Sequence, residues 1–537
     1  MRLLWTMALV ALAATPVWAD DDDGIGKIRV GVPNAVTPTP GVAQPSVIDP
    51  DFAVRLLATA ENPLENPSGV ITKFGILSTG VRTEPDQNTF IKFPQNPGGP
   101  TPGFDYGRNF LYQGHENGGN LAYVTRINLD VTDPAHRITL LTPVNPATGL
   151  TGFNAIDGST FNPFTNTFLF TQETSANLNG TGAVIQITPG WPPVVTTLEA
   201  FFGLGGYEGI HPDDKGTIYL EEDIGGATAP AGTLATVDGQ PNVPLRNARQ
   251  PNSFVYRYVP NNPARLEDGG KLQALQVIID GSPVTFHPGD VVNDIIAPAQ
   301  LKLHTPGTSW PIKWITVHES HAGDTTPFVA TAAAKAAGAT PFKRPENMAW
   351  LPDSKFRTFF FSPTGDTDAP TGQVPQLAAR GAWGALFRVD LRDDDDDDNQ
   401  GNKAKPRADD GKISIFVLGD QVHNSFDNVA FANRHQLLAA EDRGNTLHNQ
   451  LQALDSVWAY DVKNGKVLRF IALGRDAASI AQNDDNEPTG VFISNGSPRN
   501  DELLGTEESL DDARGFFTMQ HGDNNVFELL NVRKKHN

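Results

Sequence analysis

Short apolar stretches alternate with turn residues along almost the whole chain, and this pattern predicts β strands. The stretches are rich in Val, Ile, Phe, Tyr and Thr and are bounded by Gly, Pro, Asp or Asn, as strands and their turns are. After opening segments at 52–60 and 68–77, we expect strands at 109–112, 121–128, 136–142, 167–171, 183–187, 194–197, 217–221, 254–258, 273–279, 357–361, 384–389, 413–417, 428–432, 436–440, 456–461, 466–472, 515–519 and 525–530.

Few other elements are expected. Residues 328–338 (FVATAAAKAAG) form the one clear helical stretch, which Gly338 is placed to end. Residues 85–110 contain Pro and Gly throughout, so we interpret them as a loop.

One unit recurs within this pattern: an acid, an apolar strand, a turn, a second apolar strand, and another acid. Residues 157–173, 208–223 and 427–442 are complete copies, and looser copies begin at Glu346 and Glu487. Recurring strand–turn–strand units with almost no helix predict an all-β fold, and a β-propeller with loop insertions fits best. The innermost strands of a propeller converge on a central channel, so acids at corresponding places would form a ring.

Composition limits the class of protein. The chain has 537 residues, with 62 acidic against 41 basic side chains and a formal net charge of −21. This balance argues against nucleic acid or an anionic membrane as a partner, and it suits a protein that collects cations. The chain has no cysteine, which excludes thiolate metal sites, a Cys nucleophile and iron–sulfur clusters.

We divide the chain into three parts. Residues 1–19 fit a Sec-type signal peptide, because Arg2 precedes a short apolar run and a cleavage site at Val17-Trp18-Ala19; an N-terminal membrane anchor is the alternative. Residues 20–50 are predicted to be a flexible leader, and 51–537 a single propeller domain with an acidic loop insertion at 393–411. We expect a periplasmic or extracellular protein. The aspartate run within the insertion is either a calcium-binding tip or a solvated charged loop.

The recurring acids are the main candidates for chemistry. Many carboxylates cannot share a small volume while all are ionised, unless cations offset their charge. Oxygen ligands without thiolates favour hard cations, Ca²⁺ above all, with Mg²⁺, Mn²⁺ or Fe³⁺ as alternatives. Each acid could instead cap a turn or pair with a surface Arg. Our predicted metal ligands are Glu116, Asp157, Glu173, Glu208, Glu222, Glu346, Glu441 and Glu487; Asp223 and Asp442 belong to the same recurring set.

An arginine and two histidines accompany these acids. Arg344 lies two residues before Glu346, and its planar donors match phosphate oxygens. His115 and His521 each follow a strand and are candidate ligands or proton donors, or ordinary turn histidines. Our predicted catalytic set is Arg344, Asp427, Asn428 and His521. The local patterns of a phosphate-binding loop, a G-x-S-x-G elbow and H-E-x-x-H are absent.

Several short stretches resemble the PhoX-type alkaline phosphatases of bacteria. They are GHE, NAIDG, YEGIHPDDKGTIYLEED, FKRPENMAW, FDNVAF, LLAAED, EPTG and FFTMQHG, and they occur in the family's order over most of the chain. The resemblance implies a six-bladed propeller whose pore holds iron and calcium ions under a phosphomonoester. It places Glu173, Glu208, Glu222, Glu346 and Asp427 at acidic family positions, and Arg344 at the Arg that contacts phosphate.

One departure from the family concerns the metal centre. The resemblance implies a cysteine that holds iron within the stretch matching 154–158, where this chain has Ala155. The signal also lacks twin arginines. Calcium binding needs only the acids, whereas the family's iron site needs the thiolate.

Three functions stay open. The first is a secreted, metal-dependent phosphomonoesterase with a cysteine-free centre, acting as a monomer on a small phosphorylated substrate. The second is a non-catalytic calcium-binding propeller that serves as a binding or scaffold module. The third is metal-assisted hydrolysis of a different ester, such as a lactone or a phosphodiester.

Overall fold

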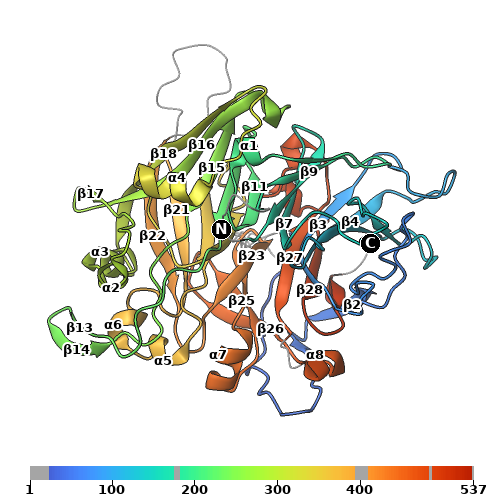
Figure 1. The fold of residues 1–537 in the computed structure, drawn as a ribbon. Coiled ribbons are helices and arrows are strands. Elements are labelled where there is room, and N and C mark those ends of the chain that lie inside the picture. Colours follow the sequence, from blue (N-terminus) through green and yellow to red (C-terminus); the bar gives the residue numbers. More distant parts are fainter. Residues whose placement is uncertain (1–22, 175–181, 393–408, 483–485, 535–537) are drawn as a thin grey trace, which may run out of the picture.

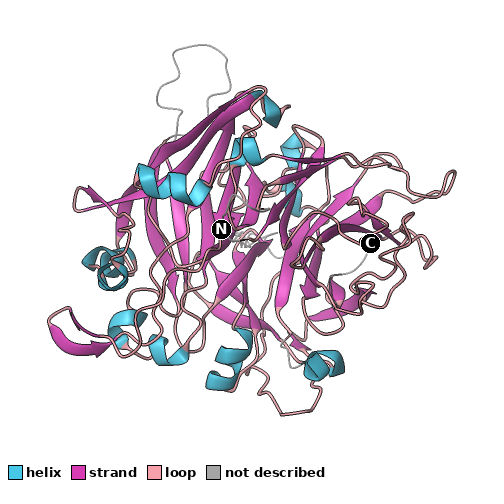
Figure 2. Cartoon of the chain, viewed as in Figure 1, coloured by secondary structure: helices cyan, strands magenta, loops and turns pink. Residues whose placement is uncertain are grey.

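The computed structural model describes residues 23–174, 182–392, 409–482 and 486–534, and these form antiparallel sheets arranged around a centre (Figure 1). The predicted signal peptide and the aspartate run at 393–398 lie outside the described residues. Strands dominate the molecule, and its helices are short (Figure 2). This arrangement confirms the predicted all-β, propeller-like fold.

Two sheets of four strands come first in the chain. In each, consecutive strands pair in sequence order. The first contains β3 (Glu84–Lys92), β4 (Asn109–Glu116), β5 (Tyr123–Asn128) and β6 (Ile138–Leu140). The second contains β7 (Ile156–Asn162), β8 (Thr167–Gln172), β9 (Ile185–Ile187) and β10 (Val195–Thr197).

A ten-stranded sheet follows, in which two four-stranded units are joined through one long strand, β18 (Ser309–His321). The first unit is β11 (Tyr207–Pro212), β12 (Ile218–Glu222), β15 (Val255–Pro260) and β16 (Gly269–Ile279), with β17 (Ser282–Pro283) beside β16. The second unit is β19 (Pro345–Trp350), β20 (Thr358–Pro363), β21 (Ala385–Leu391) and β22 (Asp410–Leu418). A separate hairpin pairs β13 (Leu234–Val237) with β14 (Gln240–Pro244).

The last two sheets each recruit a strand from near the N-terminus. One is β23 (Phe426–Asn433), β24 (Gln436–Glu441), β25 (Ser456–Asp461) and β26 (Val467–Ala472), extended by β1 (Val47–Ile48). The other is β27 (Pro488–Ser494), β28 (Arg514–Met519) and β29 (Val526–Asn531), completed by β2 (Phe52–Ala58). Pairing of β2 with β29 covers an edge of the final sheet and ties the two ends of the fold together.

The strands β3, β7, β11, β19, β23 and β27 contact one another in this order and close a ring. Each is an end strand of its sheet, so the ring lines the centre. The predicted six blades match it if the ten-stranded sheet is divided at β18; because that sheet is continuous, the blade count stays a prediction.

Aromatic side chains pack between the two units of the ten-stranded sheet. Tyr219 of β12 meets Trp350 of β19 edge to face, with ring centroids 4.9 Å apart, and both rings belong to one buried cluster. Such contacts fix how the two units pack against each other beside the centre.

Eight α-helices occur in the described residues, and all are short. They are α1 (Glu199–Phe202), α2 (Val291–Ile296), α3 (Pro298–Leu303), α4 (Ala330–Ala337), α5 (Ala369–Gly372), α6 (Pro375–Ala378), α7 (Gly444–Leu451) and α8 (Ala477–Gln482). The predicted helix at 328–338 corresponds to α4, and the left-handed Gly338 ends it. None of the described helices has the length and apolar character needed to cross a membrane.

The structure corrects one expectation about the chain's first sheet. Residues 85–110 were predicted to be a loop, but Glu84–Lys92 form β3. That strand was missed because its first half, EPDQN, is polar and contains a Pro. Glu84 and Asp86 in this polar half lie at the centre of the molecule, where polar side chains are needed.

The predicted leader is not free of the fold over residues 23–50. Ile25 and Ile28 are buried in the core, and the Ile28 backbone exchanges two hydrogen bonds with the side chain of Gln436. The N-terminal segment therefore packs against the sheet that contains β23 and β24.

Candidate metal centre

A β-bulge at the start of the innermost strands turns an acid toward the centre. In five of these strands the pairing register slips across two residues, and the first of the two is an acid. These acids are Asp86, Asp157, Glu208, Glu346 and Asp427. A bulge redirects side chains that a regular ladder would place on alternate faces, so the repeat brings carboxylates from distant parts of the chain together. In β27 the register slips between Thr489 and Phe492, and no acid lies there.

A second set of acids ends or follows the second strand of a sheet. The backbone N–H groups of Glu173, Asp223 and Asp442 donate to carbonyls just before the bulges of β7, β11 and β23. Glu116 holds the matching place at the end of β4, opposite Glu84. In the last sheet this place belongs to Gln520, which has an amide side chain. Its backbone N–H donates to the Glu487 carbonyl.

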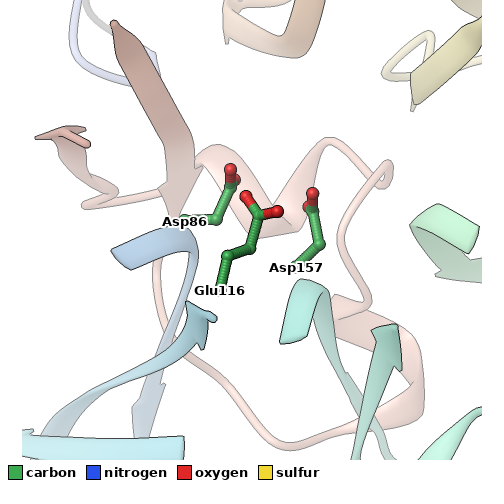
Figure 3. Close-up of side chains that lie close together, drawn as sticks. All are labelled: Asp86, Glu116 and Asp157. Carbon is green, nitrogen blue, oxygen red and sulfur yellow. The ribbon is translucent and has the colours of Figure 1, made fainter. Parts of the chain in front are cut away.

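All members of the two sets except Asp223 line one cavity of about 190 Å³, and Asp223 lies beside it, grouped with Glu208 and Glu346. All of its lining residues in the described part of the chain are polar or charged: Glu84, Asp86, Glu116, Asp157, Glu173, Glu208, Arg344, Glu346, Asp427, Asp442, Glu487, Gln520 and His521. Figure 3 shows the carboxylates of Asp86, Glu116 and Asp157 pointing into the same space.

The acids form three overlapping groups that could hold metal ions. Within each group, one ligand atom from every residue lies within 4.8 Å of the others. The groups are Asp86–Glu116–Asp157, Asp157–Glu173–Glu208 and Glu208–Asp223–Glu346. Because Asp157 and Glu208 each belong to two groups, the three groups are contiguous.

Without cations these carboxyls resist ionisation. Burial, followed by the charge of Asp223, raises the pKa of Glu173 to about 8. Burial likewise raises the pKa of Asp86 to about 6. The pKa values of five further carboxyls are raised well above their usual range, chiefly by burial and then by neighbouring acids; these are Glu116, Asp157, Glu208, Glu346 and Asp427. Bound cations would lower these pKa values again, because a positive charge stabilises the ionised carboxylates.

The donor set fits hard cations. Asp157 Oδ1 and Asp223 Oδ1 are buried and have no hydrogen-bond partner within the described part of the chain, although buried carboxylate oxygens are normally paired. All candidate ligands are oxygens, as Ca²⁺ and Mg²⁺ prefer. A thiolate-held iron does not fit, since the chain lacks cysteine.

Arg344 brings a positive charge to the same cavity. Its Nε donates to Asp223 Oδ2 at 2.8 Å, and one terminal nitrogen lies 2.9 Å from Glu346 Oε1 and 3.5 Å from Asp442 Oδ2. Burial lowers the pKa of Arg344, but these carboxylates raise it by more, so the guanidinium stays protonated.

The remaining predicted catalytic residues lie in or beside the cavity. His521 sits between Glu84 and Glu487, with nitrogen–oxygen distances of 3.8 and 3.6 Å. Asp427 lines the cavity. Asn428 does not; its side chain donates to Asp427 Oδ1 at 2.8 Å and accepts from the Gly490 N–H.

Two predicted metal ligands lie away from the cavity. Glu222 is buried in a different network, where its carboxylate accepts from Thr331, the Tyr256 hydroxyl and the Phe254 N–H. Glu441 pairs with Arg443 at 2.7 Å and accepts from the Ser456 N–H. The next residue in each case, Asp223 or Asp442, contacts Arg344 instead. The other predicted ligands all line the cavity, and His115 is buried between Thr83 and Thr125.

Three lining residues were not predicted: Glu84, Asp86 and Gln520. Glu84 and Asp86 were overlooked with β3. Gln520 was overlooked because it is an amide at a position where other sheets have acids; it donates to both Asp86 and Glu116, at 2.8 and 2.7 Å. Aligning the six strand pairs by register would have found all three.

Ala155 occupies a distinctive backbone position. It precedes Asp157 by two residues, as Arg344 precedes Glu346 and Ser425 precedes Asp427. All three have left-handed backbones, with φ of 38°, 55° and 52°. The Ala155 carbonyl accepts the Glu173 N–H, so residue 155 lies beside one of the three acid groups.

Comparisons with known proteins identify the family and a protein of similar fold. The family described as "Alkaline phosphatase PhoX" matches residues 245–523, just over half of the chain. A structure of Pseudomonas fluorescens PhoX in complex with vanadate, a transition state analogue, matches with a TM-score of 0.50 and 14% identity. The match covers 94% of this chain and 98% of that one, and at this identity it shows the fold alone. No protein of the curated set matches. The chain belongs to the PhoX alkaline phosphatase family.

Proposed function

We propose that this protein is an exported, metal-dependent phosphomonoesterase whose metal centre contains oxygen ligands and no cysteine. The observation that supports this proposal most is the juxtaposition of three overlapping acid groups with Arg344 in one cavity, within a chain of a phosphatase family. Carboxylate-bound cations and an arginine are the groups that phosphoryl transfer requires. Export to the periplasm or beyond follows from the signal-like N-terminus.

The cations would be held by the three acid groups, with Ca²⁺ the best match. Bound there, hard cations would neutralise the negative charge of the phosphate. They would also polarise its P–O bonds, which makes the phosphorus atom more open to attack. The ligands proposed are Asp86, Glu116, Asp157, Glu173, Glu208, Asp223 and Glu346; Asp427, Asp442 and Glu487 lie within reach in the same cavity.

The chain's own residues then bind and orient the substrate. Arg344 donates hydrogen bonds to phosphoryl oxygens and stabilises the charge that develops on them. His521 is placed at the wall to give a proton to the leaving alcohol. Asn428 does not reach the substrate; its hydrogen bond orients the carboxylate of Asp427. The polar lining leaves the alcohol part of the ester without an apolar pocket, so we expect a small phosphorylated substrate.

The test is hydrolysis of p-nitrophenyl phosphate by protein stripped with EDTA and then supplied with Ca²⁺, Mn²⁺ or Fe³⁺ in turn. We expect no activity after stripping and recovery with Ca²⁺ alone. Metal analysis of protein purified without added metal should find calcium and little iron. Inactivity with every cation supplied would refute a phosphatase.

Ala155 favours one alternative, a non-catalytic calcium-binding propeller that serves as a binding or scaffold module. In that case EDTA lowers the melting temperature while phosphatase activity is nil under all conditions. Activity toward a lactone or a phosphodiester, but not a phosphomonoester, would instead indicate a different hydrolysis in the same cavity.

A further inference from the structure

Arg344 adopts a backbone conformation that needs support. Its φ of 55° is left-handed, a conformation that is strained for a non-glycine residue and persists only where the surroundings fix it. The residue lies immediately before β19, and this conformation sets the direction in which its side chain leaves the backbone.

The residue before Arg344, Lys343, belongs to a buried ion pair. Lys343 Nζ is 2.6 Å from Asp366 Oδ2, and the two side chains are 6% and 0% exposed. The other carboxylate oxygen of Asp366 accepts the Arg249 N–H at 2.9 Å. Neither Lys343 nor Asp366 lines the cavity, so neither can touch a substrate there.

The backbones of the same two segments are also joined. The Thr364 N–H donates to the Arg344 carbonyl at 2.9 Å, and the Gly365 N–H donates to the Lys343 carbonyl. The 364–366 turn is itself held, because the Asp366 N–H donates to the Ala382 carbonyl. A Cβ on Gly365 would lie 2.4 Å from the Gly384 nitrogen, so this turn packs tightly against its neighbour.

Stability gives little reason for the ion pair. Burying two charges costs desolvation energy that their attraction barely offsets, and apolar pairs of similar volume are often as stable or more so. Compared with two apolar side chains, a hydrogen-bonded ion pair holds its two residues in a defined orientation.

We propose that the Lys343–Asp366 pair is a positioning device that holds Arg344 in the left-handed conformation and thereby aims its guanidinium into the cavity. The catalytic consequence of this proposal rests on the proposed function, whereas the structural consequence does not. Lys343 and Asp366 are positioning residues, acting only through Arg344.

The test separates positioning from stability by comparing single and double variants. Lys343→Met leaves Asp366 buried without its partner and should lower the melting temperature. Lys343→Met/Asp366→Leu should regain most of that loss, because no buried charge is left unpaired. Both variants should lose about 100-fold in kcat/KM on p-nitrophenyl phosphate, with KM raised, since misplacing a binding group by about 1 Å can cost that much.

Arg257→Met is the matched control. It matches the buried cation only: Arg257 on β15 is fully buried, its partner Asp409 is exposed, and neither residue lines the cavity. This variant should lose melting temperature and keep the wild-type KM. A double Lys343/Asp366 variant with wild-type KM and kcat would overturn the proposal.

Crystal structures of the double variant and the wild type give a readout that needs no activity. We expect Arg344 in the variant to leave the left-handed region and to lose its Nε bond to Asp223. If the wild type proves inactive, the proposed function fails, and these structures still decide the positioning role. An Arg344 that keeps both its φ and the Asp223 bond in the double variant would overturn it.

Discussion

Arg344 shows how much depends on the shape of one side chain. Its guanidinium reaches three acids at once, which a single ammonium group cannot do with the same geometry. The same fork is suited to the planar edge of a phosphoryl group.

We therefore expect Arg344→Lys to lower kcat/KM for p-nitrophenyl phosphate by about 100-fold although the charge is kept. Steady-state kinetics at saturating Ca²⁺ measures this. Arg388→Lys is the control, because Arg388 pairs with Asp390 on an exposed face and should keep wild-type kinetics. An Arg344→Lys enzyme of wild-type efficiency would exclude a bidentate role.

Comparing variants of Glu208 and Glu222 distinguishes a role in metal binding from a role in stability. Glu208 belongs to two acid groups, whereas Glu222 bonds only to residues outside the cavity among its described partners. We expect Glu208→Gln to lose bound calcium, and Glu222→Gln to keep it while losing about 1–2 kcal/mol of stability. Calcium per chain and chemical unfolding measure the two effects. Calcium loss in both variants would place Glu222 among the ligands after all.

At the scale of elements, the β-bulges orient the acids toward the cavity, and small residues let the innermost strands pack closely against one another. Gly158, the residue after Asp157, lies against β11 so closely that a Cβ would be 1.7 Å from the Glu208 carbonyl oxygen. The innermost strands can approach this closely only without a side chain at that point.

Gly158→Ala should force β7 and β11 apart and separate Asp157 from Glu208. We expect weaker calcium binding, measured by titration calorimetry, together with a lower melting temperature. Gly190→Ala is the matched control, since nothing lies within 4 Å of a Cβ there. Unchanged calcium affinity in Gly158→Ala would mean that the acid groups do not depend on this spacing.

The position of Ala155 allows a gain-of-function test on the same element. A thiolate at 155 would lie beside Glu173 and the second acid group, and thiolates favour iron over calcium. Ala155→Cys should raise the iron content of the purified protein, measured by mass spectrometry. Ser425→Cys, at the corresponding place before Asp427, is the comparison. Equal iron in Ala155→Cys and wild type would show that residue 155 does not select the metal.

For the whole molecule, the concentration of buried acids links stability to pH and to metal. In the metal-free protein, Glu173 has a pKa of about 8 against an ordinary 4.5, and Asp86 about 6 against 3.8. At a pH between the ordinary pKa and the folded pKa of such a group, the folded state keeps a proton that the unfolded state has lost. The stability present at low pH is therefore lost as pH rises through the folded pKa.

Chemical unfolding at pH 5 and pH 8 tests this link. The metal-free protein should be less stable at pH 8, with a slope of about 1.4 kcal/mol per pH unit for each titrating group. Saturating Ca²⁺ should remove most of this dependence, because bound cations keep the carboxyls ionised, and binding at pH 7 should release protons. Metal-free protein that gains stability from pH 5 to pH 8 would contradict the raised pKa values.

Much of the fold followed from local pattern. Short apolar strands at turn-bounded intervals predicted most of the observed strands, since alternation and turn residues act over a few neighbours. Strand β3 escaped because its polar first half faces the centre, and the longest strand, β18, was not predicted. Burial toward a polar channel is a tertiary property that local pattern does not reveal.

The sequence by itself determined that acids recur in register and that Arg344 stands beside one of them. Only the tertiary structure decided which member of each acid pair contacts Arg344. Successive residues of a strand point to opposite faces, so Glu222 and Glu441 turn into separate networks while Asp223 and Asp442 reach Arg344. Gln520 joins Asp86 and Glu116 from 404 or more residues away, because closure of the ring, and no local pattern, places the last sheet beside the first.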